Sequence, residues 1–410
     1  MKTRFFINFE NSLNPKRILT CYVLQSYAIY ITYCNVLYLI IMSKRIKLGF
    51  IGAGWWATSN HIPILQNRQD VEFSAVCRKG TQELEKVAKH FGFEYSTENH
   101  VEMLEQCDLD GVIISSPHSL HYEHAKAALN RGIHVMCEKP MALKAKEANE
   151  LVDIANKQGL HLLVPYGWHY KNFVKEAKKK LSEKCVGEIY YILVHMASPI
   201  LDLLTGKTSM IGTDGKTVEN EAVNTANTEM FFEPGVDTWS NPEVAGGGYG
   251  HSQITHSMGM FFWLTKMRIK KVFAKMSGPD SQVELYNAMT TIFDNGAIGV
   301  VSGAGSVPPT QNFQLDMRIF GSEGQLSLDC DRARMDIQRH DNNNFSLDLK
   351  GDEGSYDCEG PPNNFVDLIK GDTTENNAPG WAAARSVEFL DLAYRSIISR
   401  KEESIECLNS

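Results

Sequence analysis

The stretch that decides the fold is Ile46-Lys47-Leu48-Gly49-Phe50-Ile51-Gly52-Ala53-Gly54-Trp55-Trp56-Ala57. Its first six residues are mostly apolar and predict a buried strand, and residues 55–66 predict a helix. The turn between them matches G-x-G-x-x-[GA], in which the first glycine permits a tight bend and the second lets the backbone approach a pyrophosphate. The helix N-terminus then offers free N–H groups to the phosphates. The alternative is a glycine turn in an ordinary α/β protein. We expect dinucleotide contacts from Gly52, Ala53, Gly54, Trp55 and Trp56.

Short apolar strands alternate with helices from this motif to about residue 164. The predicted strands cover residues 71–76, 111–115, 134–137 and 161–164, and the predicted helices cover residues 82–90, 120–130 and 144–158. Such alternation is typical of βαβ units and a parallel sheet. We therefore predict an α/β fold, with an N-terminal Rossmann doubly wound parallel sheet over residues 45–165.

The second half of the chain has a different character. A long polar stretch, residues 197–248, precedes a predicted helix over residues 250–265, and Asp294-Asn295-Gly296 predicts a hairpin turn between two strands. Further strands flank Gly321-Ser322-Glu323-Gly324, and the predicted helices of the tail cover residues 364–370 and 381–399. We expect residues 166–410 to form an α+β domain for substrate binding and oligomerisation, with a mainly antiparallel open sheet.

Composition excludes some classes of protein. Hydrophobic residues make up 43% of the 410-residue chain, which is ordinary for a globular protein, and the net charge of −8 disfavours nucleic acid as a partner. The nine cysteines form no CxxC pair and are odd in number. A reduced cytoplasmic environment fits this pattern better than a disulfide framework or a zinc knuckle.

Residues 1–44 form an N-terminal extension that allows two interpretations. No charged residue occurs in residues 18–42, so by length this run could anchor the protein in a membrane. Polar residues interrupt the run, however, and Met42 stands directly before the first predicted strand. If Met42 is the natural start, residues 1–41 are dispensable, and the sequence leaves both readings open.

The end of the second predicted strand selects between NAD and NADP. An acidic residue at this point would accept hydrogen bonds from the ribose 2′-OH, but the strand runs Ala75-Val76-Cys77-Arg78-Lys79. Arg78 and Lys79 could bind a 2′-phosphate instead, or they could form a solvated basic turn. NADP is therefore favoured, and NAD stays possible.

Four ordered motifs resemble one family. They are Cys137-Glu138-Lys139-Pro140, Ser116-Pro117-His118-Ser119-Leu120-His121, the run Gly246-Gly247-Gly248 followed by His256, and Ala393-Tyr394-Arg395-Ser396. With the glycine motif upstream, they resemble the Gfo/Idh/MocA oxidoreductases, named for glucose–fructose oxidoreductase, inositol dehydrogenase and the rhizopine-catabolism protein MocA. The resemblance covers the chain from about Ile46 to its end.

The resemblance implies a reaction and its residues. Lys139 would lie beside the nicotinamide and exchange a proton with a substrate hydroxyl, with His256 as partner acid/base. The reaction would be hydride transfer between nicotinamide and a secondary alcohol of a sugar or cyclic polyol. The family often forms oligomers, so a homodimer or homotetramer is expected. Further cofactor contacts would come from Ser116, Pro117, His118, His121, Glu138 and Lys139.

Three positions depart from the family pattern. The family's aspartate four residues before the histidine is Ser252, its arginine after the sixth strand is His169, and its glycine before the histidine is Ile254. Gln253 or His251 could replace the missing carboxylate. These changes leave the substrate open. The candidate substrate-binding residues are Trp168, His169, Tyr170, Trp239, Ser252, Gln253 and His256.

Other readings of the same residues remain. The spacing of His118, His121 and His124 is that of neighbours on a helix and lacks Cys or carboxylate partners, so no metal is expected. One rival function is a cofactor-retaining glycosidase or lyase with no net redox change. Another is a non-catalytic dinucleotide-binding sensor, which the changes at Ser252 and His169 favour and the retained Lys139 opposes.

Overall fold

The computed structural model describes residues 45–207, 231–349 and 353–408. The apolar segment at residues 18–42, the question of Met42 and the middle of the polar stretch at residues 197–248 lie outside these ranges. None of the helices within them combines the length and the apolar character needed to cross a bilayer.

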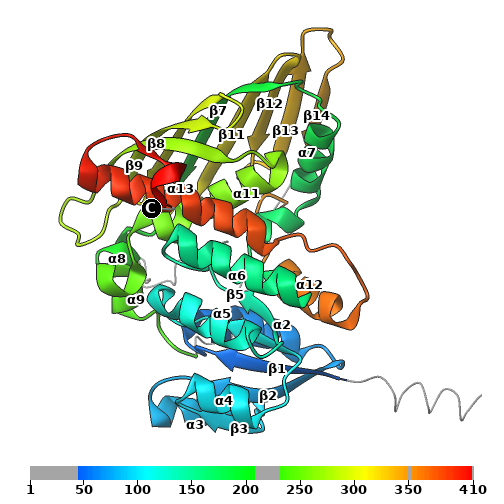
Figure 1. Ribbon diagram of the computed structural model, residues 1–410, viewed down its shortest axis with the longest axis vertical. Coiled ribbons are helices and arrows are strands. Elements are labelled where there is room, and N and C mark those ends of the chain that lie inside the picture. Colours follow the sequence, from blue (N-terminus) through cyan, green and yellow to red (C-terminus); the bar gives the residue numbers. More distant parts are fainter. Residues whose placement is uncertain (1–44, 208–230, 350–352, 409–410) are drawn as a thin grey trace, which may run out of the picture. The chain divides into compact units, whose positions relative to one another are not determined.

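The first half of the described chain builds a six-stranded parallel sheet in the order β3-β2-β1-β4-β5-β6 (Figure 1). The order reverses between β1 and β4, which is the point where doubly wound folds bind their ligands. This confirms the predicted Rossmann sheet. The strands are β1 (Ile46–Ile51), β2 (Val71–Cys77), β3 (Tyr95–Thr97), β4 (Gly111–Ile114), β5 (His134–Cys137) and β6 (Leu162–Leu163).

Helices connect these strands in alternation, as predicted. Helix α3, for example, buries Leu84, Val87 and Phe91 at helical spacing and ends where Gly92 takes a left-handed φ of +75°. Strand β3 and helix α4 were not predicted. The helical elements of this half are η1 (Ala57–His61), α2 (Ile62–Gln66), α3 (Thr81–Phe91), α4 (His100–Gln106), η2 (His118–Leu120), α5 (His121–Leu129) and α6 (Ala145–Gln158).

The second half builds a nine-stranded sheet in the order β14-β13-β12-β11-β7-β10-β9-β8-β15. Every pairing is antiparallel except that of β7 with β10, so the predicted sheet is confirmed. Asp294-Asn295-Gly296 does turn β9 into β10. The strands are β7 (Ile189–Ala197), β8 (Ile269–Ser277), β9 (Tyr286–Phe293), β10 (Ile298–Ala304), β11 (Gln314–Gly321), β12 (Gly324–Asp329), β13 (Arg334–Arg339), β14 (Phe345–Asp348) and β15 (Glu403–Ser404).

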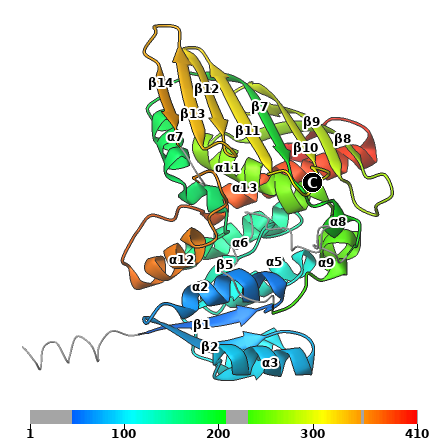
Figure 2. The same ribbon diagram turned by 180° about the vertical axis from the view of Figure 1, so that it is seen from behind.

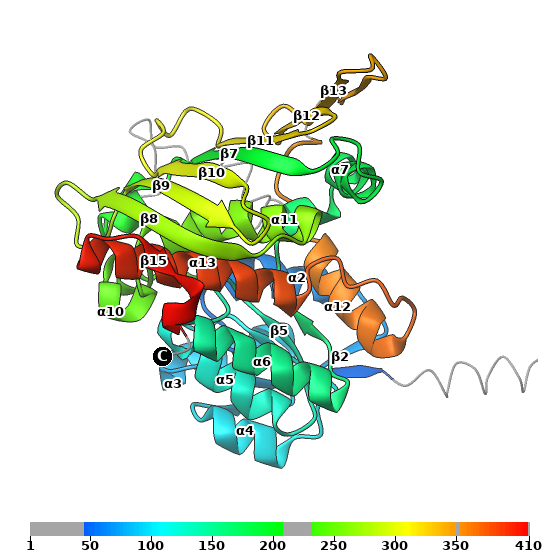
Figure 3. The same ribbon diagram turned by 45° about the horizontal axis from the view of Figure 1, so that its top comes forward.

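Helices α11 and α13 lie along one face of this sheet (Figure 3). Alternate strand residues such as Ile192 and Val301 point into that buried side, while Leu193 and Val300 point to the other face and stay half-buried. The helical elements of this half are η3 (Gly167–Tyr170), α7 (Asn172–Ser182), α8 (Leu201–Leu204), α9 (Val236–Ser240), α10 (Pro242–Ala245), η4 (Gly250–Ile254), α11 (Thr255–Thr265), α12 (Gly360–Lys370), α13 (Gly380–Ser399) and η5 (Ile405–Leu408).

The two sheets share helices near the end of the chain. Helix α12 lies beside α2 (Figure 2), and Phe365, Val366 and Val387 belong to the same hydrophobic core as Leu48 of β1. Residues far beyond 165 thus complete the core of the parallel sheet. The division at residue 165 stays a prediction, because the core does not stop there.

Candidate active site

The glycine turn lies at the reversal point of the parallel sheet. Gly52 has a φ of +90°, and a Cβ there would come within 2.3 Å of the Ser116 nitrogen, so only glycine lets the ends of β1 and β4 meet. A Cβ on Gly54 would meet nothing within 4 Å. The second glycine therefore faces open space at a helix N-terminus, and these residues fit the pyrophosphate of a dinucleotide.

Arg78 lies at the end of β2, beside this turn. Its Nη1 donates to the carbonyl of Ala53 at 3.0 Å and its Nε to the carbonyl of Lys79 at 3.1 Å. The guanidinium also stacks over Phe232, 4.3 Å from the ring centroid, while the Lys79 side chain is exposed. Arg78 is thus held against the glycine turn, and its Nη2 has no protein partner among the described residues.

The segment after β4 is tied to the neighbouring strand end by histidines. His121 contacts two carbonyl oxygens at 2.7 Å each, that of Ser116 through Nε2 and that of Pro140 through Nδ1. His124 Nδ1 bonds the Ser116 hydroxyl at 2.9 Å, and His118 Nδ1 contacts the carbonyl of Ala245 at 3.0 Å. The ring nitrogens of the three histidines therefore contact separate protein groups and do not converge on one point. His121 joins the ends of β4 and β5.

Lys139 follows directly on β5, and its side chain is buried. Its Nζ donates to the main-chain carbonyl of Ser252 at 2.9 Å and lies 5.4 Å from the ring centroid of Trp239. Burial lowers the pKa of Lys139 below the usual lysine value, and the charge of Glu138 opposes this shift. A buried ammonium with donors to spare can bind a hydroxyl and exchange a proton with it.

Glu138 binds two side chains that come from the glycine turn and its helix. Its Oε1 accepts from Trp56 Nε1 and from His61 Nε2, each at 2.7 Å, and its Oε2 accepts from the Lys139 main-chain N–H at 3.2 Å. Burial alone would raise the pKa of Glu138, but the His61 bond and the Lys139 charge outweigh it, so that pKa lies below the usual value. The sequence analysis did not include His61 among the candidate site residues.

The three glycines before His256 pack against protein. A Cβ on Gly246, Gly247 or Gly248 would come within 2.1–2.4 Å of Leu143, Tyr394 or the main chain of Glu284, respectively. The sequence motif is thus explained by close packing around this turn. The Glu284 carboxylate also accepts from the main-chain N–H groups of Gly248 and Gly250, at 2.8 Å each, and from Tyr394. Glu284 and Tyr394 therefore fix the start of η4, which carries Ser252.

His256 lies in a cage of aromatic rings. Tyr166, Trp168 and Tyr356 each meet its ring edge-on, with centroids 5.2–5.7 Å apart. Its Nδ1 has no hydrogen-bond partner among the described residues, and burial followed by the charge of Lys139 holds its pKa well below the usual histidine value. His256 is thus a neutral imidazole near the ammonium of Lys139. Tyr356, like His61, belongs to no motif in the sequence.

Some of the remaining candidate residues lie near Lys139, and others are bound by protein groups. Trp239 lies with Lys139 and His118, whose ring centroid is 5.8 Å away, and Gln253 Oε1 accepts from Ser198 at 3.4 Å. His169 stacks on Trp263, and its Nδ1 contacts the carbonyl of Asn377 at 2.9 Å. Two further side chains are engaged by protein: Tyr170 donates to Asn364, and Trp168 Nε1 donates to the carbonyl of Gly354.

No side chain of the described residues bonds the buried Nδ1 of His256, where a carboxylate at position 252 would be expected to act. The Ser252 hydroxyl is buried and lacks a partner among the described residues, and both ring nitrogens of His251 lack one as well. His251 instead packs on Tyr394, with ring centroids 4.5 Å apart. Neither residue therefore orients His256, and it is the main chain of Ser252 that contacts Lys139.

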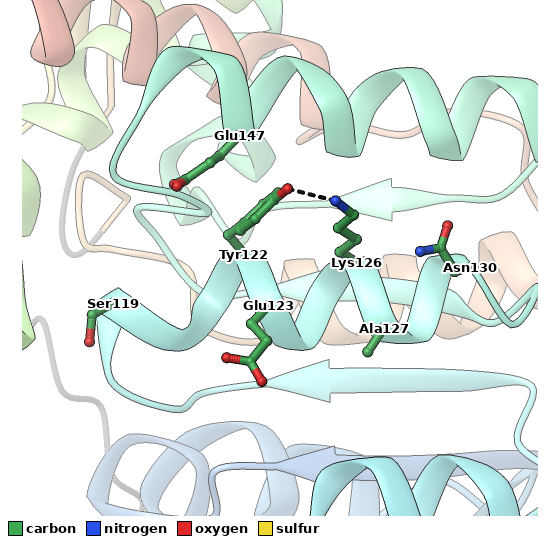
Figure 4. Close-up of a pocket in the computed structure, with 7 residues that line it drawn as sticks. All are labelled: Ser119, Tyr122, Glu123, Lys126, Ala127, Asn130 and Glu147. Atoms are coloured by element: carbon green, nitrogen blue, oxygen red, sulfur yellow. Dashed lines mark hydrogen bonds between the residues drawn. The ribbon is translucent and has the colours of Figure 1, made fainter.

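A cavity beside α5 is separate from the residues around Lys139 (Figure 4). Lys126 donates to the Tyr122 hydroxyl at 2.9 Å and pairs with Glu150 at 2.7 Å, so the cation that lines this cavity is already paired with protein. The candidate site is the one around Lys139. The cavity is lined by Ser119, Tyr122, Glu123, Lys126, Ala127, Asn130 and Glu147.

Two family models match the chain. Residues 46–166 match the model described as an oxidoreductase family with an NAD-binding Rossmann fold, and residues 222–327 match the GFO/IDH/MocA C-terminal domain. Together the two ranges cover more than half of the chain, and they include every one of the sequence candidates up to His256 except Trp168, His169 and Tyr170.

Curated relatives match about a third of the chain. D-glucoside 3-dehydrogenase of Escherichia coli is 32% identical over 148 residues, which are 36% of this chain and 42% of that protein. Glucose-6-phosphate 3-dehydrogenase of Bacillus subtilis is 34% identical over 149 residues, 36% of this chain and 41% of that protein. An NADP(+) scyllo-inositol 2-dehydrogenase of Bacillus subtilis is 30% identical over 148 residues, which are 35% of this chain and 39% of that protein. The chain thus spans about two fifths of the length of these relatives.

Solved structures share the whole fold. Levoglucosan dehydrogenase, solved with NADH and levoglucosan, has a TM-score of 0.66 at 18% identity and covers 88% of this chain and 99% of its own. Aldose-aldose oxidoreductase from Caulobacter crescentus has a TM-score of 0.65 at 19% identity, with the same coverage of 88% and 99%. At these identities the likeness extends to the fold alone.

Proposed function

The chain belongs to the Gfo/Idh/MocA family of oxidoreductases, and from this premise we propose that it oxidises or reduces a secondary alcohol of a sugar or cyclic polyol. The observation that carries the proposal is the buried Lys139 ammonium, whose pKa is lowered, at the strand end next to the glycine turn. A bound nicotinamide would supply the hydride chemistry. The dehydrogenases of sugars and inositol among the relatives support this substrate class.

In this proposal Lys139 handles the proton. One donor of its ammonium is bound to the Ser252 carbonyl, which aims the group, and the others can reach a substrate hydroxyl. A positioned cation stabilises the charge that develops on that oxygen. His256, neutral because of its burial, is the second group that can accept or return a proton, and aromatic rings rather than a carboxylate orient it.

The experiment that tests the proposal is a screen of sugars and polyols with both NAD and NADP, followed by the absorbance of the reduced cofactor. Turnover with at least one secondary alcohol supports it. Release of a glycone without consumption of free cofactor would contradict it and identify a cofactor-retaining glycosidase or lyase. Cofactor binding with no chemistry on any substrate would instead identify a sensor.

We further propose that NADP binds better than NAD, because Arg78 and Lys79 stand where an acid would bind the ribose. Arg78→Asp should weaken NADP binding about tenfold or more, since one charge-assisted bond to a phosphate is worth roughly 1.5–3 kcal/mol. Titration of both dinucleotides into both proteins measures this, with NAD as the internal control for the lost contact to Ala53. Equal wild-type affinities, or equal losses for the two cofactors, would reject the preference.

We propose a homodimer or homotetramer that forms through the face of the nine-stranded sheet opposite α11 and α13. That face exposes part of Leu193, Val300, Tyr191 and Phe320, an apolar surface on adjacent strands. Leu193→Arg should therefore shift the protein to a monomer in light scattering. Ile398→Arg is the matched control, because Ile398 is 82% exposed and lies on α13. A wild-type monomer, or an unchanged mass in Leu193→Arg, would contradict the interface.

We propose the cytoplasm as the working compartment, which the buried free thiols of Cys77, Cys137 and Cys330 support. Cell fractionation of the full chain tests this. Recovery in the membrane fraction would favour the anchor reading of residues 18–42.

A further inference from the structure

Trp56 and His61 are five residues apart, a spacing that a regular α-helix does not place on one side. The helix that follows the glycine turn begins with a π-helical turn, η1 (Ala57–His61), which has one extra residue per turn. This extra residue brings both side chains to the same carboxylate oxygen, Oε1 of Glu138, at 2.7 Å each. The π-helical turn is therefore the local feature that makes this three-residue network possible.

The network joins two parts of the site that separate strands carry. Trp56 is part of the glycine turn after β1, whereas Glu138 and Lys139 follow β5. The second oxygen of Glu138 accepts from the Lys139 main-chain N–H, so the same carboxylate binds both segments. The side chains of His61 and Glu138 are only 3% and 10% exposed, and Trp56 is half-buried, so water competes little for these bonds.

A buried carboxylate needs such donors to stay ionised. Without them, desolvation favours the neutral acid, and with them the charged form is stabilised. Glu138 in turn is the group that counters the effect of burial on Lys139. The charge of the proposed catalytic lysine therefore depends on two residues that do not touch it.

We propose that Trp56 and His61 are positioning residues that keep Glu138 ionised and thereby fix the charge and placement of the Lys139 ammonium. The inference rests on the proposed function for its kinetic consequence only, because the hydrogen-bond network itself is independent of any substrate. It also means that the dinucleotide turn and the catalytic strand end are one connected unit.

Other titratable groups surround the pair, and none replaces the two donors. Burial lowers the pKa of His118, His121 and His256, and it raises the pKa of the neighbouring phenols and thiols. The groups that face the pair are His61, His118, His121, His256, Tyr166, Tyr356, Cys137 and Cys358.

The sign of the effect follows from this arrangement. Removing one donor weakens the ionised form of Glu138, so the pKa of Glu138 rises. Where Glu138 becomes neutral, Lys139 loses its counter-charge and its own pKa falls further. Both changes appear at the acid end of the pH range first.

The first test needs no substrate. In protein labelled with ¹⁵N-tryptophan, the Trp56 indole N–H is followed from neutral pH down to the lowest pH at which the protein stays folded, because the Glu138 pKa lies below its usual value. The resonance is assigned by its loss in Trp56→Phe. We expect a strongly downfield resonance that moves upfield in Glu138→Gln, and whose titration shifts to higher pH in His61→Leu. His61→Gln, which keeps an N–H donor, should restore part of the shift. An indole resonance unaffected by Glu138→Gln would overturn the network.

The second test uses the enzyme with the substrate found by the screen. His61→Leu should shift the acid limb of the kcat profile upward, so that kcat falls about tenfold on that limb and changes little at neutral pH, while the dinucleotide Kd changes much less. His340→Leu, at an exposed histidine, is the matched control. Wild-type kcat and pH profile in His61→Leu would reject the positioning role. Absence of turnover in wild type, with the indole titration intact, would reject the proposed function and leave the network supported.

Discussion

Lys139→Met is expected to lower kcat by at least about 10²-fold while dinucleotide affinity stays near wild type, since a positioned acid/base typically contributes 10²- to 10⁴-fold. Methionine keeps the length and suits the burial of the side chain but removes the ammonium that binds the Ser252 carbonyl. The glycine turn at Gly52 and Gly54 lies on another strand and is untouched, so cofactor binding should not depend on the ammonium.

The measurement is kcat and dinucleotide Kd for wild type, Lys139→Met and His256→Ala. The exposed Lys144 supplies the matched control, Lys144→Met. His256→Ala should lose less than Lys139→Met, because burial lowers the pKa of His256 and no carboxylate among the described residues bonds its Nδ1. Near-wild-type turnover in Lys139→Met would reject the mechanism, and loss of folding or of cofactor binding would show that Lys139 is structural.

The fold was largely predictable because its signals are local. Strand β1 was predicted with its observed bounds, Ile46–Ile51, since a short apolar run before a glycine turn has few other outcomes. Strand β3 and helix α4 were missed because each is short and only weakly apolar, with Tyr95 to Thr97 half-buried or exposed. Strand β3 depends on its pairing with β2, whereas α4 does carry a local signal, the Asn99 N-cap, whose side chain accepts from the main-chain N–H groups of Val101 and Glu102.

Part of the candidate site could be named from the sequence, because Lys139 and Gly52 lie in motifs of characteristic spacing. The residues that hold Lys139 could not, because they depend on contacts across the fold. His61 reaches Glu138 only through a π-helical turn, and Ser252 acts through its main chain, which carries no sequence signal. Tyr356, in the segment before α12, covers His256 from a distance of 100 residues.

The reason for the glycines near His256 also required the structure. Glycines can let a helix approach a cofactor closely, but the space at Gly247 is filled by Tyr394 and the space at Gly248 by Glu284. The same absence of a Cβ can serve protein packing as well as ligand binding. Only the neighbouring atoms distinguish the two.

The two glycines of the dinucleotide turn allow that distinction to be measured. Gly52→Ala should destabilise the protein by roughly 2–5 kcal/mol, because an L-residue is strained at a φ of +90° and the new Cβ would overlap the main chain of buried Ser116. Gly54→Ala has open space for its Cβ and should leave the free energy of unfolding within about 0.5 kcal/mol of wild type.

The same Gly54→Ala protein should nevertheless bind the dinucleotide about tenfold or more weakly, because its Cβ occupies the space where a pyrophosphate approaches the backbone. Urea unfolding and dinucleotide titration of both variants give the two quantities separately. Wild-type stability in Gly52→Ala would contradict the packing of β1 against β4. Wild-type affinity in Gly54→Ala would show that the pyrophosphate does not pass over this turn, even if the protein still catalyses hydride transfer by another binding mode.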